Sequence, residues 1–470
     1  MEVPRTLDPN TARLLPWLIA VAFFMQSLDA TILNVALPAM AHDLGQNPLR
    51  MQSVVIAYIL TVAALIPTSG WIADRFGSRR VFCIAIALFT LGSLFCALSE
   101  SLSALIISRV IQGFGGALMV PVGRLTILRA FPRSELVRVM SFVTVPALIG
   151  PLAGPTVGGW LVEYLSWHWI FLINLPIGVI GCVLSARLMP DFRRERRQRF
   201  DGAGFVLFSA ATLSLSLALE GLGDMHLSGP RVVVLLVTGL GCLAAYWLRA
   251  LRIDEPLFSP TLFRIRTFTV GIIGNLFARL GNGALPFLIP LLLQVGLGFS
   301  PSRAGLSMIP MTLAAMLAKP LVRPLLDRVG YRRTLVANTL LLGALIMSLG
   351  LLGPATPYWL LLLQLSALGL VNSLQFTAMN TITLIDLEGD NAASGNSLLA
   401  VVMQLSIGMG VASSAALLGG FSAGGEGDVR TVLDAFAATF LAVGAMAMLA
   451  SMIFFQLHPG DGRTRPRRRR

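Results

Sequence analysis

Long runs of apolar residues, which recur fourteen times along the chain, constrain its fold more than any other feature. A helix needs about 20 consecutive apolar residues to cross a bilayer core of about 30 Å, and each run is close to that length. Hydrophobic residues make up 55% of the 470 residues and charged residues only 13%, whereas soluble domains carry about 25% charged residues. Because backbone amides must be hydrogen-bonded inside lipid, these runs predict an all-α integral membrane protein.

The charged residues are mainly arginines, and they gather in alternate connections between the apolar runs. Loops rich in Lys and Arg stay in the cytoplasm, so this alternation predicts that both termini are cytoplasmic. The net charge of +13 would suggest nucleic acid in a soluble chain, but here topology and lipid headgroups account for it, and we expect no nucleic-acid partner. The four cysteines lie within apolar runs at no metal-ligand spacing, so we expect no metal site.

A short basic segment occurs twice, at corresponding places in the two halves of the chain. Residues 74–80 read Asp-Arg-Phe-Gly-Ser-Arg-Arg and residues 327–333 read Asp-Arg-Val-Gly-Tyr-Arg-Arg, so five of seven positions are identical. The arginines alone would be ordinary cytoplasmic loop charge, but the repeat indicates two similar helix bundles with the same hinge loop, as in alternating-access transporters. We therefore predict a six-helix bundle at 1–190, a linker with two extra transmembrane helices at 191–261, a second six-helix bundle at 262–458 and a basic cytoplasmic tail at 459–470.

The first copy of this segment, Gly70-x-x-x-Asp74-Arg75-x-Gly77-x-Arg79-Arg80, resembles the loop between the second and third helices of the major facilitator superfamily. The resemblance implies two six-helix halves that rock around a central site. The two extra helices make the layout similar to the fourteen-span drug:proton antiporter branch. The second copy has Arg323 where the first has Gly70, so we expect its loop to pack less tightly. The resemblance assigns a hinge role to Gly70, Asp74, Arg75, Gly77, Arg80, Asp327, Arg328 and Gly330.

One carboxylate, that of Asp29, lies well inside an apolar run. A carboxylate at the centre of a membrane helix costs at least about 2.5 kcal/mol, so it is kept only with a partner or a task. It could simply pack between helices. The segment Leu28-Asp29-Ala30-Thr31-Ile32-Leu33-Asn34-Val35-Ala36-Leu37-Pro38, however, resembles the first-span motif of the fourteen-span antiporters, which implies that Asp29 takes part in proton coupling. A buried carboxyl that is neutral on one face of the membrane and ionised on the other can carry a proton.

The fourth apolar run contains Arg109-Val110-Ile111-Gln112-Gly113, which resembles the superfamily's Arg-x-x-Gln-Gly motif. At about 1.5 Å per residue, Arg109 and Asp29 lie roughly 8 and 10 Å from the outer ends of their helices, and this similar depth permits an ion pair. The pair would hold Asp29 ionised until a proton or substrate competes, or it could be permanent and structural. Gln112 lies one turn further inward. Together with Gln26 and Asn34 on the first run, it is a candidate for the substrate pathway.

The fifth run carries glycines at 150, 154 and 158, which fall on one helix face where another helix can approach closely. Pro151 and Pro155 remove amide donors and bend this helix. The whole pattern resembles the signature of superfamily antiporters, and it implies export and a seal between the halves that suppresses proton leak. The residues of this antiporter helix are Gly150, Pro151, Gly154, Pro155, Gly158 and Gly159.

Arg279 lies close to the bilayer midplane, about 16 Å into the ninth run by helix rise. An arginine facing lipid at that depth would be very costly, so it is predicted to face the cavity or a partner. Neutral polar residues near it and on the twelfth run would either line the substrate pathway or tie helices together. They are Asn275, Asn282, Asn372, Gln375 and Asn380.

Together these patterns predict a proton-coupled efflux transporter, an antiporter that exports drugs or other small amphiphilic compounds by alternating access. The alternative is an exporter of an organic anion or metabolite chelate, because Arg109 and Arg279 outnumber the single buried carboxylate. No clustered nucleophile, base or metal ligands suggest an enzyme. We expect a monomer in the bacterial inner (cytoplasmic) membrane, in contact with lipid and without a cofactor. Its partners would be a small-molecule substrate and protons, with the proton gradient as driving force.

Overall fold

The computed structural model describes residues 8–193, 200–223, 229–388, 390–422 and 429–462, and every long regular element within them is a helix. Up to residue 250 these helices are α1 (Pro9–Asp43), α2 (Gln52–Leu65), α3 (Ser69–Phe76), α4 (Ser78–Ala97), α5 (Leu102–Ala130), α6 (Arg133–Tyr164), α7 (Trp169–Leu172), α8 (Asn174–Leu188), α9 (Gly202–Gly223) and α10 (Gly229–Ala250). They continue with α11 (Arg266–Asn282), α12 (Leu285–Leu291), α13 (Pro301–Ser307), α14 (Ile309–Val329), α15 (Tyr331–Ser348), α16 (Tyr358–Leu384), α17 (Asp390–Ser422), α18 (Val429–Leu449) and α19 (Ser451–Phe454).

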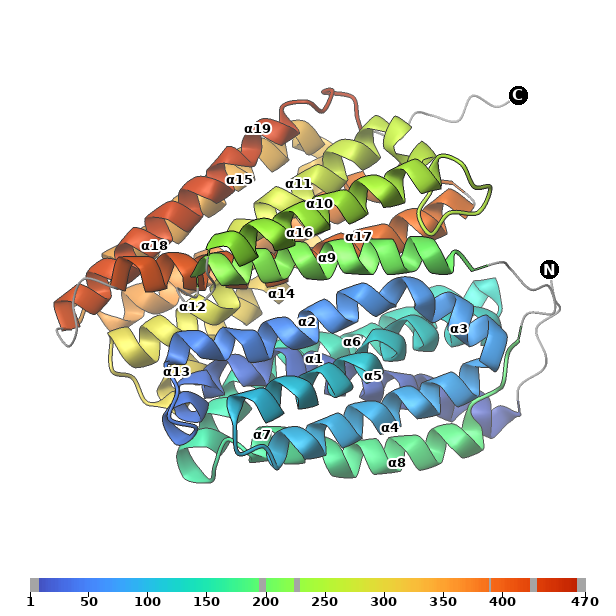
Figure 1. The fold of residues 1–470 in the computed structure, drawn as a ribbon, viewed down its shortest axis with the longest axis horizontal. Coiled ribbons are helices and arrows are strands. Elements are labelled where there is room, and N and C mark those ends of the chain that lie inside the picture. Colours follow the sequence, from blue (N-terminus) through green and yellow to red (C-terminus); the bar gives the residue numbers. More distant parts are fainter. Residues whose placement is uncertain (1–7, 194–199, 224–228, 389, 423–428, 463–470) are drawn as a thin grey trace. The chain divides into compact units, whose positions relative to one another are not determined.

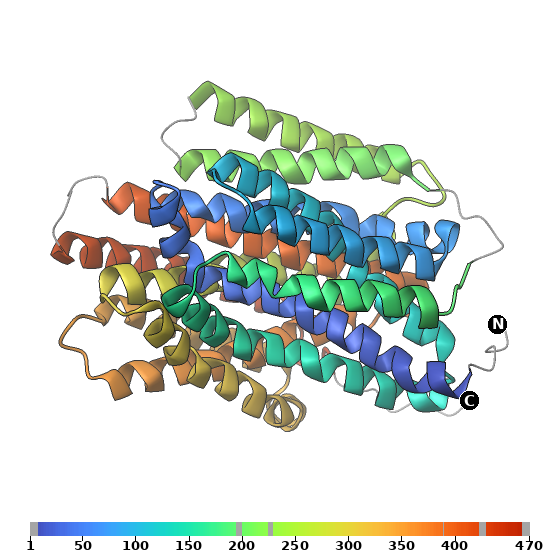
Figure 2. The same ribbon diagram turned by 90° about the horizontal axis from the view of Figure 1, so that it is seen from below.

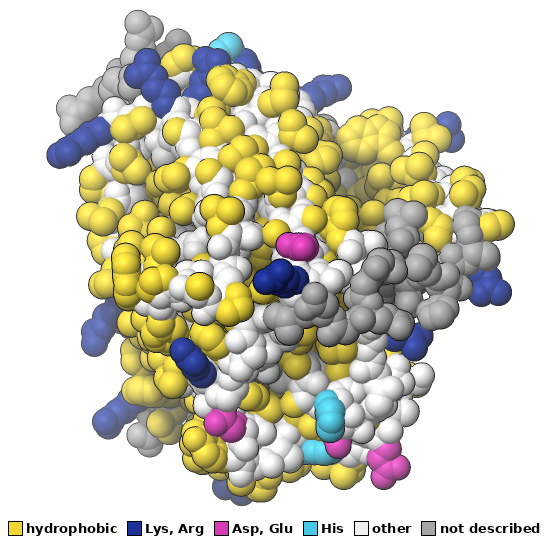
Figure 3. Space-filling model, turned by 90° about the vertical axis from the view of Figure 1, so that its left-hand side faces the viewer, with side chains coloured by type: hydrophobic (Ala, Val, Ile, Leu, Met, Phe, Trp, Pro, Cys, Tyr) yellow, Lys and Arg dark blue, Asp and Glu magenta, His cyan; other side chains and the backbone are white. Residues whose placement is uncertain are grey.

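Fourteen helical segments of the described chain are long and apolar enough to cross a membrane, from Thr11–Asp43 to Arg430–Phe454. The predicted all-α membrane fold with fourteen spans is therefore confirmed. Large apolar side chains also cover much of the protein's outside: Leu317 is 75% and Leu351 85% exposed, and Figure 3 shows hydrophobic side chains spread over one face. In water such a surface would aggregate, whereas in a bilayer it meets lipid tails of the same polarity.

The helices pack into two compact units. Unit 1 consists of residues 1–217, 234–243 and 289–309, and unit 2 of residues 218–233, 244–288 and 310–470. Figures 1 and 2 show α1 to α8 side by side as one bundle within unit 1. Its core includes Phe82 and Phe89 of α4, and the core of unit 2 includes Phe454 of α19. The predicted domain boundaries stay predictions, and positions 194–199 of the predicted linker and 463–470 of the basic tail lie outside the described residues.

The repeated basic segment adopts the same backbone in both units. Gly77 joins α3 to α4 at φ 93°, and Gly330 joins α14 to α15 at φ 87°. This left-handed region strains any residue with a Cβ atom, so the glycine at each position is required by the turn. The two copies therefore match in conformation as well as in sequence.

Candidate functional site

A buried ion pair lies inside unit 1, between α1 and α5. Arg109 donates from Nη1 to Oδ2 of Asp29 over 2.8 Å, and each side chain is only 1% exposed. The similar depths of the two residues predicted that they could meet, and the structure places them in direct contact. Two charges so far from water are kept only when further hydrogen bonds satisfy them.

Amide side chains supply those further hydrogen bonds. Gln112, one turn from Arg109 on α5, donates from Nε2 to Oδ1 of Asp29 over 2.8 Å, while its Oε1 accepts from Arg109 over 2.6 Å. Asn174, the first residue of α8, donates to the same Oδ1 over 3.4 Å. The hydroxyl oxygen of Ser93 on α4 accepts from Gln112 over 2.7 Å and from Asn174 over 3.0 Å. Both carboxylate oxygens of Asp29 are thus hydrogen-bonded, and four helices hold the network.

Arg109 has further contacts that do not involve the carboxylate. Its Nε donates to the carbonyl oxygen of Val54 over 3.4 Å, and its guanidinium lies 4.3 Å from the centre of the Tyr58 ring. A cation on an aromatic face is stabilised even without a negative partner. If Asp29 took up a proton, Arg109 would keep Val54, Tyr58 and Gln112. These contacts hold the guanidinium of Arg109 in place independently of Asp29.

Three members of this site escaped the sequence reasoning: Ser93, Asn174 and Tyr58. Ser93 and Tyr58 are single polar residues in apolar runs, with nothing in the pattern to distinguish them. Asn174 follows the aromatic stretch Trp167-His168-Trp169, which reads as an interfacial anchor. The chain turns between α7 and α8 at Ile173, and α8 begins at Asn174, which is 1% exposed. The signal in the sequence was therefore the polar Asn174 shortly after an aromatic stretch.

The glycine face of α6 packs directly against α1 on either side of Asp29. A Cβ at Gly150 would lie 2.1 Å from Oγ of Ser27, and one at Gly154 would lie 2.2 Å from Oγ1 of Thr31. Gly158 continues the face, 2.7 Å from the carbonyl oxygen of Ile32 by the same construction. Thr31 also donates to the carbonyl oxygen of Gly150 over 3.3 Å. The predicted close approach of a second helix is confirmed, and that helix is the one that carries Asp29.

The same helix also meets α13, a part of unit 1 that comes from the second half of the sequence. A Cβ at Gly159 would lie 2.2 Å from the carbonyl oxygen of Pro301, and one at Gly305 would lie 2.1 Å from that of Pro155. Beside this crossing, Glu163 accepts hydrogen bonds from the backbone amide of Ser302 over 3.0 Å and from its hydroxyl over 2.6 Å. Two glycines and one carboxylate thus hold α13 on α6. Pro151 lies on α6 among these residues, and the role predicted for it stays a prediction.

Unit 2 buries a different cation, Arg279 of α11, which is 5% exposed. Its Nε donates to Oδ1 of Asn275 over 3.1 Å, and its guanidinium lies 4.7 Å from the centre of the Phe376 ring on α16. Its Nη2 has no hydrogen-bond partner, and no carboxylate among the described residues is within ion-pair distance. Arg279 therefore differs from Arg109, whose charge is balanced by Asp29.

The remaining polar candidates differ in whether their hydrogen-bonding atoms are all satisfied within the described residues. Gln375 is 1% exposed and fully engaged with α15: its Oε1 accepts from Asn338 over 2.8 Å and its Nε2 donates to Thr339 over 2.7 Å. It therefore ties two helices together, one of the two roles open to these residues. Asn282 contacts Asn372 across α11 and α16, while Oδ1 of Asn282 and of Asn380 lack partners among the described residues.

The two polar candidates on α1 lie near Asp29. Gln26 is half-buried one turn before Asp29. Asn34 is 7% exposed and donates to the carbonyl oxygen of Ala30 on its own helix over 3.4 Å. Among the described residues, neither side chain is hydrogen-bonded to Asp29, and their assignment to the substrate pathway stays a prediction.

The residues of the first hinge loop make more side-chain contacts than those of the second. In unit 1, Asp74 accepts from Arg129 of α5 over 2.6 Å, and the guanidinium of Arg75 lies 5.4 Å from the Trp71 ring. In unit 2, Asp327 lies 3.9 Å from Arg323, and both side chains are largely exposed. A Cβ at Gly70 would meet nothing within 4 Å, so Arg323 at the equivalent position removes no close packing. Arg80 and Arg328 are exposed, at the start of α4 and the end of α14.

The long apolar helices, the repeated hinge segment and the buried ion pair are features of a multi-pass membrane transporter. The model of the Major Facilitator Superfamily matches residues 19–410 and 271–470 of this chain. The chain therefore belongs to the major facilitator superfamily, a family of transporters and not of enzymes.

Several relatives are similar over most of their length. The multidrug resistance protein MdtD of Serratia proteamaculans is 52% identical over 406 residues, which cover 86% of this chain and 85% of that one. Proteins of the same name from Pectobacterium atrosepticum and Escherichia coli are each 48% identical, with coverage of 96% of this chain and 97% and 96% of theirs.

Solved structures share the fold at low sequence identity. A POT family transporter in complex with a thioalcohol-conjugated peptide aligns with a TM-score of 0.70 at 17% identity and covers 94% of this chain and 95% of that one. The nucleoside transporter NupG aligns with a TM-score of 0.64 at 13% identity and covers 94% of this chain and 98% of that one. These likenesses concern the fold alone.

Proposed function

We propose that this chain is a proton-coupled efflux transporter of the cell's inner membrane, which exports drugs or other small amphiphilic compounds in exchange for protons. The observation that carries the proposal is the Asp29–Arg109 pair, 1% exposed on both sides and hydrogen-bonded through Gln112 and Asn174. The relatives named multidrug resistance protein MdtD support the substrate class.

Asp29 would carry the proton. In its ionised form it accepts from three donors, which together stabilise the negative charge. Uptake of a proton would remove the attraction of about one unit charge for Arg109 and release the link between α1 and α5. Because α6 packs against α1 at Gly150 and Gly154, a shift of α1 would be transmitted to α6 and from there to α13. Proton uptake and helix movement would thus be coupled mechanically.

This arrangement does not require the cargo to displace the proton at the same atoms. The carboxylate is enclosed by helices of unit 1, so competition between proton and cargo would act through the position of α1. The hinge glycines Gly77 and Gly330 would absorb the accompanying change of helix direction. The arginine distribution places both termini in the cytoplasm in this proposal.

The test is efflux from proteoliposomes with and without a pH gradient. Asp29→Asn keeps the size of the side chain and one acceptor oxygen but cannot exchange a proton, so the gradient should no longer accelerate efflux of a cationic dye. The double variant that combines Asp29→Asn with Asn34→Asp would move the carboxyl along α1 without restoring Arg109 as its partner. It should remain inactive. Gradient-driven efflux at the wild-type rate in Asp29→Asn would refute the proposal.

A second candidate function rests on Arg279. Its charge is unbalanced among the described residues and its Nη2 has no partner, which favours a cargo with a carboxylate, such as an organic anion or a metabolite chelate. Export of an aromatic carboxylate would then depend on Arg279, while Arg279→Gln would leave efflux of a cationic dye intact. Equal effects of Arg279→Gln on both cargoes would exclude this candidate.

A further inference from the structure

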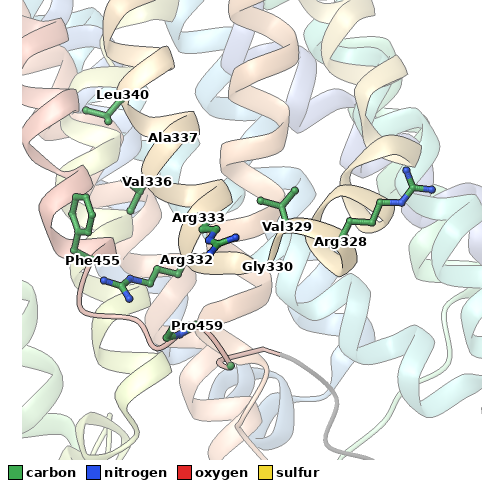
Figure 4. A pocket seen from close by; sticks show the side chains of 11 residues that line it. Arg328, Val329, Gly330, Arg332, Arg333, Val336, Ala337, Leu340, Phe455 and Pro459 are labelled. Atoms are coloured by element: carbon green, nitrogen blue, oxygen red, sulfur yellow. The ribbon is translucent and has the colours of Figure 1, made fainter.

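An open cavity of about 790 Å³ lies in unit 2, where α14 passes into α15 at Gly330. Three arginines line it, Arg328, Arg332 and Arg333. Figure 4 shows Arg332 directed toward Phe455, with Arg328 on the opposite side of the Gly330 turn. This is the end of the helices that the arginine distribution places at the cytoplasmic face.

Unit 1 shows what occupies the corresponding place in the other copy of the repeat. There the segment after α8 closes over the turn, and Oδ1 of Asp191 accepts from the backbone amide of Arg79 over 3.3 Å. A Cβ at Gly77 would lie 2.2 Å from the same oxygen, so the carboxylate sits directly on the turn. Ser78 strengthens this closure by donating to the carbonyl oxygen of Pro190 over 3.1 Å. In unit 1 a negative group of the protein itself therefore covers the hinge.

In the described part of unit 2, no such carboxylate lies on the turn. The nearest atom to a Cβ built at Gly330 is the carbonyl oxygen of Pro459, 3.9 Å away. Asp461, two residues further on, accepts from the backbone amide of His458 over 2.7 Å and so caps its own turn. Among the described residues no carboxylate is within ion-pair distance of Arg328, Arg332 or Arg333. Where unit 1 has a bound carboxylate, unit 2 has an arginine-lined space.

One wall of this space is apolar and leads away from the arginines into the membrane-spanning part of α15. Arg333, Val336, Ala337 and Leu340 line the cavity at positions i, i+3, i+4 and i+7 of α15, so they form one stripe on the helix. From Arg333 to Leu340 the stripe rises about 10 Å. Phe455 of the segment after α19 forms the facing wall, with its ring 5.9 Å from the guanidinium of Arg332. The arginines are suited to bind the charged headgroup of a lipid, and the apolar wall beside them is suited to contact the start of its acyl chain.

We propose that this cavity binds an anionic phospholipid of the cytoplasmic leaflet. Its phosphate would lie against Arg332 and Arg333, with Arg328 at the rim, and its acyl chain would follow Val336, Ala337 and Leu340. Arginines near a membrane surface attract anionic headgroups, and basic recesses between helices are suited to hold them. The lipid would thus supply to unit 2 the negative group that Asp191 supplies to unit 1, and it would hold the α14–α15 turn in place.

The test is titration of the full-length protein in detergent with phosphatidylglycerol, with bound lipid counted by native mass spectrometry. Phosphatidylcholine is the comparison lipid, and inorganic phosphate and glycerol 3-phosphate are the competitors without acyl chains. Arg332→Gln should weaken phosphatidylglycerol binding about fivefold, and Arg332→Gln with Arg333→Gln about 25-fold. Arg323→Gln is the matched control, because it removes an arginine from the same end of α14 that does not line the cavity.

Two further variants examine the wall and the comparison with unit 1. Leu340→Gln should weaken phosphatidylglycerol binding without changing the charge. Pro459→Asp introduces a carboxylate beside Gly330, as in unit 1, and should lower lipid binding while the protein remains folded. Equal binding of phosphatidylglycerol and phosphatidylcholine, or an equal loss in Arg323→Gln and Arg332→Gln, would overturn the proposal. Displacement of the lipid by inorganic phosphate at equal concentration would also overturn it, because the ligand would then be free phosphate.

Discussion

Removing either charge of the Asp29–Arg109 pair should destabilise the protein more than removing both. Asp29→Asn leaves the guanidinium of Arg109 buried without a negative partner, and Arg109→Gln leaves the carboxylate buried without a positive one. Breaking a buried pair from one side costs about 3–5 kcal/mol. The double variant has no buried charge at this site, and its loss should be limited to weakened hydrogen bonds, about 1–3 kcal/mol.

The magnitude to be measured is the difference between these losses. The two single variants together should lose about 6–10 kcal/mol of unfolding free energy, so the coupling energy of the pair should be at least about 3 kcal/mol.

The assay is SDS-induced unfolding of the full-length protein in mixed micelles, followed by tryptophan fluorescence. Refolding from SDS is checked for each variant, because an irreversible transition would report a rate and not a free energy. Additivity of the two single variants within about 0.5 kcal/mol would refute the reasoning, since it would mean that the two side chains do not interact.

Three further outcomes follow from the packing. Gly154→Val should cost about 1–3 kcal/mol and slow efflux, because its Cβ would lie 2.2 Å from Oγ1 of Thr31, whereas Gly241→Val, where a Cβ meets nothing within 4 Å, should be neutral in the same unfolding and efflux assays. Asn174→Leu removes a donor to Asp29, so gradient-driven efflux should slow, and an unchanged rate would argue against its part in the network. Gln375→Leu should lower unfolding free energy by about 1–3 kcal/mol while the preference among cargoes stays the same, because Asn338 and Thr339 each lose one of their hydrogen bonds; a changed preference would place Gln375 in the pathway instead.

Features that depend on local pattern could be predicted from the sequence. Apolar run length predicted the fourteen spans, and the spacing of Gly150, Gly154 and Gly158 predicted a helix crossing, which the structure assigns to α1. The similar depth of Asp29 and Arg109 followed from helix rise alone. Helix ends were less predictable: proline is a common sign of a helix end, but α1 continues past Pro38 to Asp43 because a proline inside a long membrane helix is tolerated.

Features that depend on which helices become neighbours could not be predicted. Ser93 belongs to the network only because α4 lies beside α5, and Asn174 only because α8 begins at that depth. Gln375 and Asn372 are both neutral amides in the same apolar run, and nothing in the sequence separates them. In the structure, the amide oxygen and nitrogen of Gln375 are both hydrogen-bonded to α15. One amino-acid sequence does not show which side chains far apart in it become partners. It shows only the depth in the membrane at which each residue is expected.

The enclosure of Asp29 has a pharmacological consequence. If Asp29 carries the proton, as proposed, a compound that reached this carboxylate, or that held α6 against α1, would stop turnover without having to compete with cargo. Its potency would not fall as cargo concentration rises, and cargo-site variants that defeat competitive blockers would leave it effective. On the proposed mechanism, the glycine-lined contact between α1 and α6 is therefore a second place at which the transport cycle could be stopped.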